Sequence, residues 1–116
     1  MPNEDCVFCR IVAGEVPAAV VHEDDHAIAF EDLNPQAPEH LLVIPRRHTT
    51  SVASLEEGDR ELAGHLMVVA GRVARERGLE SSGYRVVANV GDQGGQTVPH
   101  LHLHVLGGRS MTWPPG

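Results

Sequence analysis

The run VPHLHLHVLGG, residues 98–108, constrains the fold most, because histidine and aliphatic residues alternate strictly along it. In a β-strand, successive side chains point to opposite faces. We therefore predict a strand over residues 100–106, with three imidazoles on one face and three aliphatic side chains in the core. The histidines are His100, His102 and His104, and the aliphatic residues are Leu101, Leu103 and Val105.

The other apolar patterns predict two helices and four more strands around this strand. Leu62, Leu66, Val69 and Val73 follow one another in steps of four, three and four, which is typical of a helix. The predicted elements are a short helix at 6–13, strands at 19–24, 26–32, 40–45 and 84–89, and a long helix from Arg60 to near Gly78. We expect a single α+β domain over residues 1–116, with a five-stranded antiparallel sheet, one short helix and one long helix.

Composition excludes several classes of protein. The formal net charge of −7 argues against a nucleic-acid-binding surface, which normally needs a basic patch. No apolar run approaches the roughly 20 residues that cross a membrane, so no membrane partner is expected. The first ten residues, MPNEDCVFCR, are acidic and lack the apolar region of a signal peptide. We expect a cytoplasmic protein.

The histidine row has three interpretations from the residues alone. It could be a solvated strand face, a metal site, or a site of nucleophilic and acid–base chemistry on an anionic substrate. The preceding loop GDQGGQT, residues 91–97, favours the third, because its glycines let the backbone approach an anion closely. Asn89, Gln96 and Thr97 add polar groups beside it.

The row and its surroundings resemble the histidine-triad nucleotide-binding proteins, and in particular their Hint branch. The resemblance covers nearly the whole chain. It is carried by FEDLNPQAPEHLLVIPRRH (30–48), LAGHLMVVA (62–70), GYRVVANVGDQGGQTVPHLHLHVLGGR (83–109) and WPPG (113–116).

The resemblance implies an enzyme that hydrolyses purine nucleoside 5′-phosphoramidates, with AMP or GMP as the nucleotide part. His102 would be the nucleophile and would form a nucleotidyl-histidine intermediate that water then hydrolyses. The backbone carbonyl of His100 would orient His102, and His104 would contact the phosphate and help protonate the leaving group. His40 would complete the cluster. The resemblance implies no cofactor for this catalysis.

The resemblance also implies the binding residues. Asn89, Gln96 and Thr97 would hold phosphate and ribose oxygens, and Asp32 would accept from the ribose hydroxyls. Phe30 and Leu33 would line the nucleoside pocket, although core positions are the simpler interpretation of both from sequence. Thr97 stands where Hint proteins often have Ser, and Thr112 where the animal members commonly have His.

The resemblance further implies a homodimer. The sheets of two protomers would join into ten strands across the long helices and the penultimate strands. The tail, residues 107–116, would lie at the interface, and Trp113 would reach the partner's active site. From the sequence alone, Trp113 could equally pack on its own subunit.

Cys6 and Cys9 have the C-x-x-C spacing of a metal or redox pair. A redox pair lacks the expected thioredoxin-like context, and two unligated cysteines are a further alternative. A structural zinc needs four ligands, so two histidines must complete any site. The wider family and the related galactose-phosphate uridylyltransferases combine such a pair with two histidines, which correspond here to His48 and His100. We therefore predict a structural Zn²⁺ site.

Two other functions stay open at this point. One is hydrolysis or transfer on dinucleoside polyphosphates, and the other is a non-catalytic nucleotide-binding regulatory protein. The complete histidine set favours an enzyme, since a protein that only binds has no chemical need for a nucleophile at position 102.

Overall fold

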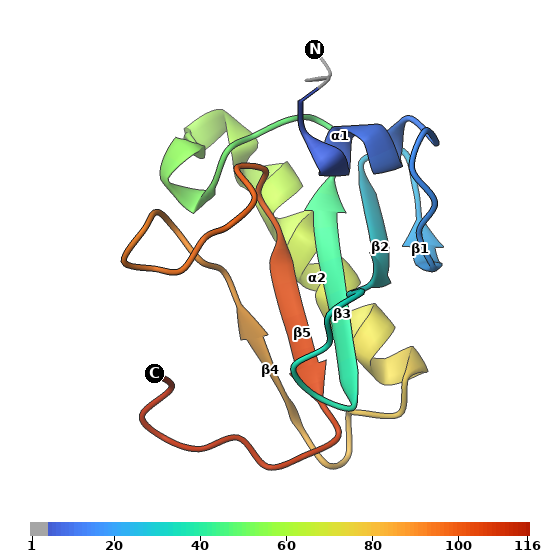
Figure 1. The fold of residues 1–116 in the computed structure, drawn as a ribbon, viewed down its shortest axis with the longest axis vertical. Coiled ribbons are helices and arrows are strands. Elements are labelled where there is room, and N and C mark those ends of the chain that lie inside the picture. Colours follow the sequence, from blue (N-terminus) through green and yellow to red (C-terminus); the bar gives the residue numbers. More distant parts are fainter. Residues whose placement is uncertain (1–4) are drawn as a thin grey trace.

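The computed structural model describes residues 5–116 as one sheet with helices on both faces (Figure 1). Two α-helices flank the sheet: α1 (Val7–Val12) and α2 (Arg60–Glu76). Two short 3₁₀ turns at Val52–Ser54 and Glu57–Asp59 lead into α2. The strands are β1 (Val20–Glu23), β2 (Ala27–Glu31), β3 (Glu39–Pro45), β4 (Tyr84–Val87) and β5 (Leu103–Gly107). They form one antiparallel sheet in the order β1-β2-β3-β5-β4, which confirms the predicted α+β fold.

Strand alternation divides the core into two layers. Leu41 and Val43 of β3 pack with the apolar side of α2 on one face of the sheet. Leu42 and Ile44 point to the other face, where they pack with Phe8 of α1. Figure 1 shows α2 running behind the sheet and α1 above the far end of β3. The short helix therefore covers the face that carries the histidines.

The predicted strand at 100–106 is three residues too long at its start, since β5 begins only at Leu103. Continuing the register between β3 and β5 would place Pro45 opposite Leu101, and proline has no N–H for the sheet. The Leu101 N–H instead donates to the Thr49 carbonyl at 2.6 Å. The alternation of faces persists, because Leu101 packs in the core beside α2 while Phe8 contacts the rings of both His100 and His102.

The other boundaries differ less. β4 ends at Val87 rather than 89, where the chain enters the glycine-rich loop. α2 ends at Glu76 with Arg77 as its C-cap, close to the predicted end near Gly78. In the described part of the chain, no helix combines the length and apolar character that a membrane crossing requires.

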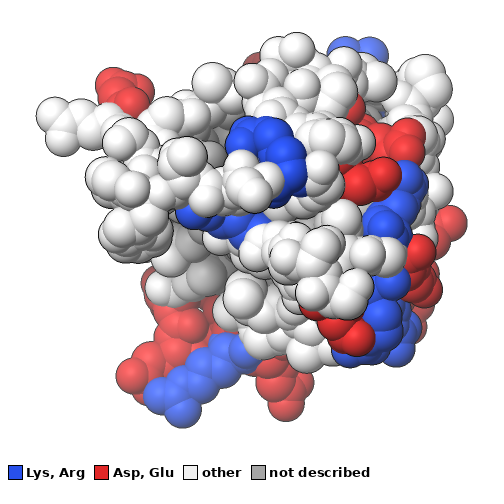
Figure 2. All heavy atoms as spheres, turned by 90° about the horizontal axis from the view of Figure 1, so that it is seen from below, with Lys and Arg blue, Asp and Glu red and all other residues white. Residues whose placement is uncertain are grey.

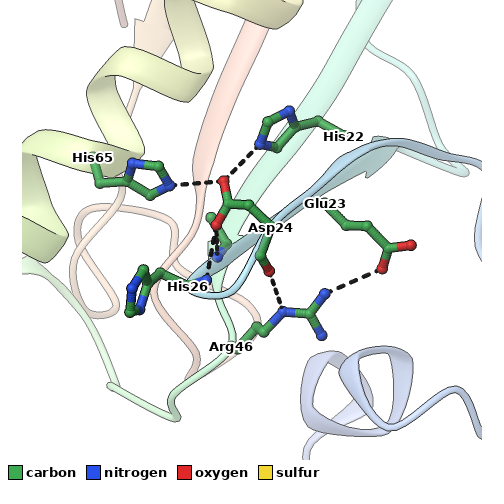
Figure 3. Close-up of polar contacts among 7 residues, drawn as sticks. His22, Glu23, Asp24, His26, Arg46 and His65 are labelled. Atoms are coloured by element: carbon green, nitrogen blue, oxygen red, sulfur yellow. Dashed lines mark hydrogen bonds and ion pairs between the residues drawn. The ribbon is translucent and has the colours of Figure 1, made fainter.

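A hydrogen-bonded cluster of His22, Asp24 and His65 joins α2 to the β1–β2 turn (Figure 3). Oδ2 of Asp24 lies 2.7 Å from Nε2 of His22 and 2.7 Å from Nε2 of His65, which belongs to α2. Arg46 donates its Nε–H to the Asp24 carbonyl at 2.6 Å and pairs with Glu23. The Asp24 carboxylate thus joins the hairpin to α2, and the Asp24 backbone carbonyl joins the hairpin to Arg46 at the end of β3.

Candidate functional site

A cavity of about 450 Å³ opens on the α1 face of the sheet. One wall is α1 with the segment that follows it, and the other is formed by β2, β3, the loop between them and the histidine strand. Seven of the residues that the sequence singled out line it: Phe30, Asp32, Leu33, His40, Thr97, His102 and His104. Phe30 is buried in the core and also lines the cavity, whereas Leu33 is 93% exposed, so the core interpretation holds for Phe30 and is wrong for Leu33.

His102 is held in one orientation by the backbone. Its Nδ1 lies 2.7 Å from the carbonyl oxygen of His100. A carbonyl only accepts, so in a neutral His102 ring Nδ1 carries the proton and Nε2 keeps a free lone pair. The ring also packs edge-on against Phe8, with centroids 5.2 Å apart. The arrangement presents an unprotonated nitrogen, which is the form of imidazole that acts as a nucleophile.

His40 and His104 form a hydrogen-bonded chain whose direction is fixed from one end. The Gln36 N–H donates to Nδ1 of His40 at 3.0 Å, so the proton of a neutral His40 resides on Nε2. Nε2 of His40 lies 2.8 Å from Nδ1 of His104 and donates to it. A neutral His104 therefore carries its own proton on Nε2. This polarity suits His104 to donate a proton, and it occupies the nitrogens through which His40 could bind a metal.

The pKa values agree with neutral rings at these positions. Burial, followed by the neighbouring His102 and His40, lowers the pKa of His104 to about 4. Burial also lowers the pKa of His40, although Asp32 opposes the shift, with its Oδ2 3.4 Å from Nε2 of His40. Both rings are thus uncharged near neutral pH.

Three predicted binding residues lie outside the cavity lining of the described chain. Asn89 donates to the Gly94 carbonyl at 2.6 Å. The Gln96 side chain donates to the Thr50 and Val98 carbonyls and accepts from the Gly91 N–H. Both side chains brace the glycine-rich loop. Trp113 is 82% exposed near the C-terminus.

The sequence interpretation missed the wall that α1 contributes. Val7, Phe8 and Ile11 line the cavity, together with Val16 from the segment after the helix. Phe8 contacts Phe30 edge-on at a centroid distance of 5.6 Å. The spacing of these apolar residues, three and four apart, is the signal that could have identified this face.

His100 itself points away from the cavity into a second cluster. Sγ of Cys6, Sγ of Cys9, one ring nitrogen of His48 and one of His100 all lie within 4.8 Å of one another. Nδ1 of His100 lies 3.3 Å from Sγ of Cys6, and Nδ1 of His48 lies 3.2 Å from Sγ of Cys9.

The donor set of this cluster fits zinc. Two thiols and two imidazoles are a tetrahedral ligand set for Zn²⁺. Nε2 of His100 lies 2.9 Å from the Pro45 carbonyl and donates to it, so Nδ1 is free to bind a cation. Burial raises the pKa of the Cys6 thiol, and a bound cation would favour its thiolate.

Comparison with known proteins gives one consistent result. The family model of the HIT domain matches residues 13–111. An uncharacterized HIT-like protein of Synechococcus elongatus is 47% identical over 114 residues, covering 98% of this chain and 99% of the relative. A 14 kDa zinc-binding protein of Zea mays is 50% identical over 118 residues, covering 100% of this chain and 91% of the relative.

A solved structure of the same family has nearly the same fold. The crystal structure of a HIT family hydrolase from Legionella pneumophila Philadelphia 1 superposes with a TM-score of 0.94 at 50% identity, covering 96% of this chain and 99% of that chain. The chain belongs to the HIT domain family, and its fold is that of the hydrolases in it.

Proposed function

We propose that this protein hydrolyses purine nucleoside 5′-phosphoramidates through a nucleotidyl-histidine intermediate. The observation that carries the proposal is the orientation of His102, whose Nδ1–H is directed to the His100 carbonyl while the ring lines the cavity. A ring held in this way attacks phosphorus through Nε2 without first losing a proton.

Two displacements at phosphorus complete the reaction. Nε2 of His102 forms a bond to the α-phosphorus as the bond from phosphorus to the leaving nitrogen breaks. The electron pair leaves with the amine, and His104, which carries its proton on Nε2, supplies a proton to it. Water then attacks phosphorus and returns a proton to Nε2 of His104, the bond to His102 breaks, and the nucleoside monophosphate is released.

The cavity walls support a purine nucleoside as the bound part of the substrate. Phe8, Ile11 and Phe30 line the cavity and offer an apolar surface for a base. Asp32, at the same cavity, accepts from the ribose hydroxyls, and Thr97 donates to the phosphate. Asn89 and Gln96 act by shaping the glycine-rich loop beside the phosphate.

Cys6, Cys9, His48 and His100 would hold a structural Zn²⁺. Its chemistry there is to stabilise two thiolates and cross-link α1 to the histidine strand, since all four ligand positions come from the protein. We expect the protein to act in the cytoplasm, where cysteines remain reduced and available to a metal.

A homodimer is the assembly that we propose. Val68 and Met67 on α2 are 66% and 55% exposed, which is unusual for large apolar side chains on a helix. β4 is an edge strand of the sheet, and its Val86 packs against the core cluster that contains the buried residues of α2. Pairing of two such edges would join the sheets into ten strands and bring the tail with Trp113 to the second protomer.

The test is the release of AMP from adenosine 5′-phosphoramidate by wild type and by His102→Asn. We expect turnover by wild type and its loss in the variant. Equal release by both would exclude His102 as the nucleophile. AMP binding without release by either would favour the regulatory alternative, and cleavage of diadenosine polyphosphates alone would favour the other enzyme class.

A further inference from the structure

Arg77, the C-cap of α2, binds two carboxylates from two different strands. Its Nη2 donates to Glu31 at 3.0 Å, and its Nη1 donates to Glu39 at 3.2 Å. The guanidinium side chain is 30% exposed, so the pair is partly shielded from water. Figure 2 views the molecule from the end where α2 finishes, and acidic and basic side chains lie side by side on that face.

Each of these two glutamates directly precedes a residue of the candidate active site. Glu31 precedes Asp32, and Glu39 precedes His40. Asp32 and His40 are also joined to each other, because the Asp32 N–H donates to the His40 carbonyl at 2.9 Å. A second cavity of about 190 Å³ is lined by all five of these residues, so the ion pairs and the two site residues border the same space.

One exposed ion pair would do little to hold the site residues in place, since isolated surface ion pairs add little to the free energy of unfolding. Here one planar guanidinium with several fixed donors binds side chains from both the end of β2 and the start of β3. Both ends flank the backbone bond that aligns Asp32 with His40. Sub-ångström shifts of His40 would weaken the 2.8 Å contact with His104.

We propose that Arg77 is a positioning residue for the active site. It holds Glu31 and Glu39 so that Asp32 faces the ribose and His40 keeps its hydrogen bond to His104. The inference rests on the proposed function for its kinetic consequence, while its structural consequence can be measured without any substrate.

The experiment compares Arg77→Met with Arg75→Met. Arg75 is the matched control, because it lies on the same helix end, pairs with Glu80 rather than with Glu31 or Glu39, and has an exposed side chain. With adenosine 5′-phosphoramidate as the probe, we expect kcat to fall about tenfold in Arg77→Met and to stay unchanged in Arg75→Met. Nitrogen NMR of the imidazoles in the free protein should show a loss of the fixed His40 proton position in Arg77→Met only.

A triple variant shows whether the loss of activity comes from charge repulsion or from lost positioning of the site residues. Removing Arg77 leaves two unpaired carboxylates near an anion-binding cavity, which could repel the substrate. In Arg77→Met combined with Glu31→Gln and Glu39→Gln that repulsion is absent. We expect activity to remain low, and recovery to wild-type kcat would overturn the proposal.

The proposal stays testable if the Arg77→Met variant does not fold or if the wild type does not cleave the probe. If Arg77→Met does not fold, Arg77→Lys and Glu39→Gln each remove one arm of the contact, and both should lower kcat and perturb His40. If wild type does not cleave the probe, the proposed function fails, and the His40 spectrum still decides the role of Arg77. Identical spectra and kinetics for the Arg77 and Arg75 variants would contradict it.

Discussion

The carbonyl oxygen of His100 lies 2.7 Å from Nδ1 of His102, while the imidazole of His100 points the other way, with Nδ1 3.3 Å from Sγ of Cys6. One residue therefore contributes its backbone to the proposed nucleophile and its side chain to the proposed metal site. This arrangement explains why three histidines alternate along the chain although they do not share one task.

Removal of the metal should weaken nucleotide binding. α1 has only six residues, too few to be stable as a free helix, and it is joined to the rest of the chain through its thiols and through Phe8. Because α1 is one wall of the cavity, we expect protein stripped of zinc to bind AMP at least about tenfold more weakly by calorimetry.

Amide hydrogen exchange measures whether α1 becomes less ordered when the metal is removed. Residues 7–12 should exchange faster after metal removal, while α2 stays protected. Cys9→Ser should reproduce the effect. Equal AMP affinity and equal exchange with and without zinc would show that the metal has no part in forming the cavity.

Protonation of His104 should destabilise the fold in mild acid. Its pKa in the folded protein is about 4, below the ordinary value of 6.5. The unfolded chain therefore binds more protons between these two values, and the free energy of unfolding falls as the pH drops through that window. In urea titrations at about pH 7 and about pH 5, His104→Asn should lose less stability than wild type by about 1 kcal/mol. An identical loss in both proteins would contradict the neutral, buried ring.

Asp24 should be a stabilising residue outside the active site. Burial alone would raise the pKa of Asp24, but hydrogen bonds from His22, the His26 N–H, His65 and the Ala27 N–H outweigh it and hold that pKa well below 3.8. A lowered carboxyl pKa adds stability above the ordinary value that is lost as the pH falls. We expect Asp24→Asn to lower the free energy of unfolding at neutral pH by about 1–2 kcal/mol.

The matched control for this change is Asp25→Asn, at the exposed neighbouring position. Thermal unfolding of both variants should show a lower Tm for Asp24→Asn only, with phosphoramidase activity retained at low temperature. Equal Tm values would mean that the hydrogen-bonded cluster around Asp24, between α2 and the β1–β2 turn, adds no stability.

The exposed side of α2 predicts how the proposed dimer can be broken. A charge at Val68 would be buried against the second protomer, so Val68→Glu should sediment as a monomer in analytical ultracentrifugation. Val52→Glu, at a 44% exposed position in a 3₁₀ turn, should remain dimeric. A wild-type protein that is already monomeric would refute the proposed assembly.

The sequence predicted most of the fold because its period-two and period-3.6 patterns are clear, as in the histidine strand and in α2. It did not predict where β5 begins, because that depends on Pro45, a residue on another strand. It also missed Phe8 and its neighbours, since a six-residue helix gives a weak pattern. The direction of the His40–His104 chain depends on the Gln36 N–H, a backbone contact that no residue pattern encodes.

The most direct test of the account is to look for nucleotide covalently attached to His102 during turnover. Wild type would be mixed with adenosine 5′-phosphoramidate and quenched in alkali, because the phosphorus–nitrogen bond of a nucleotidyl-histidine is labile in acid. Mass spectrometry of the peptides should find one AMP group on His102 and none in His102→Asn. Full turnover with no adduct at any time, or an adduct at another residue, would contradict the proposed mechanism.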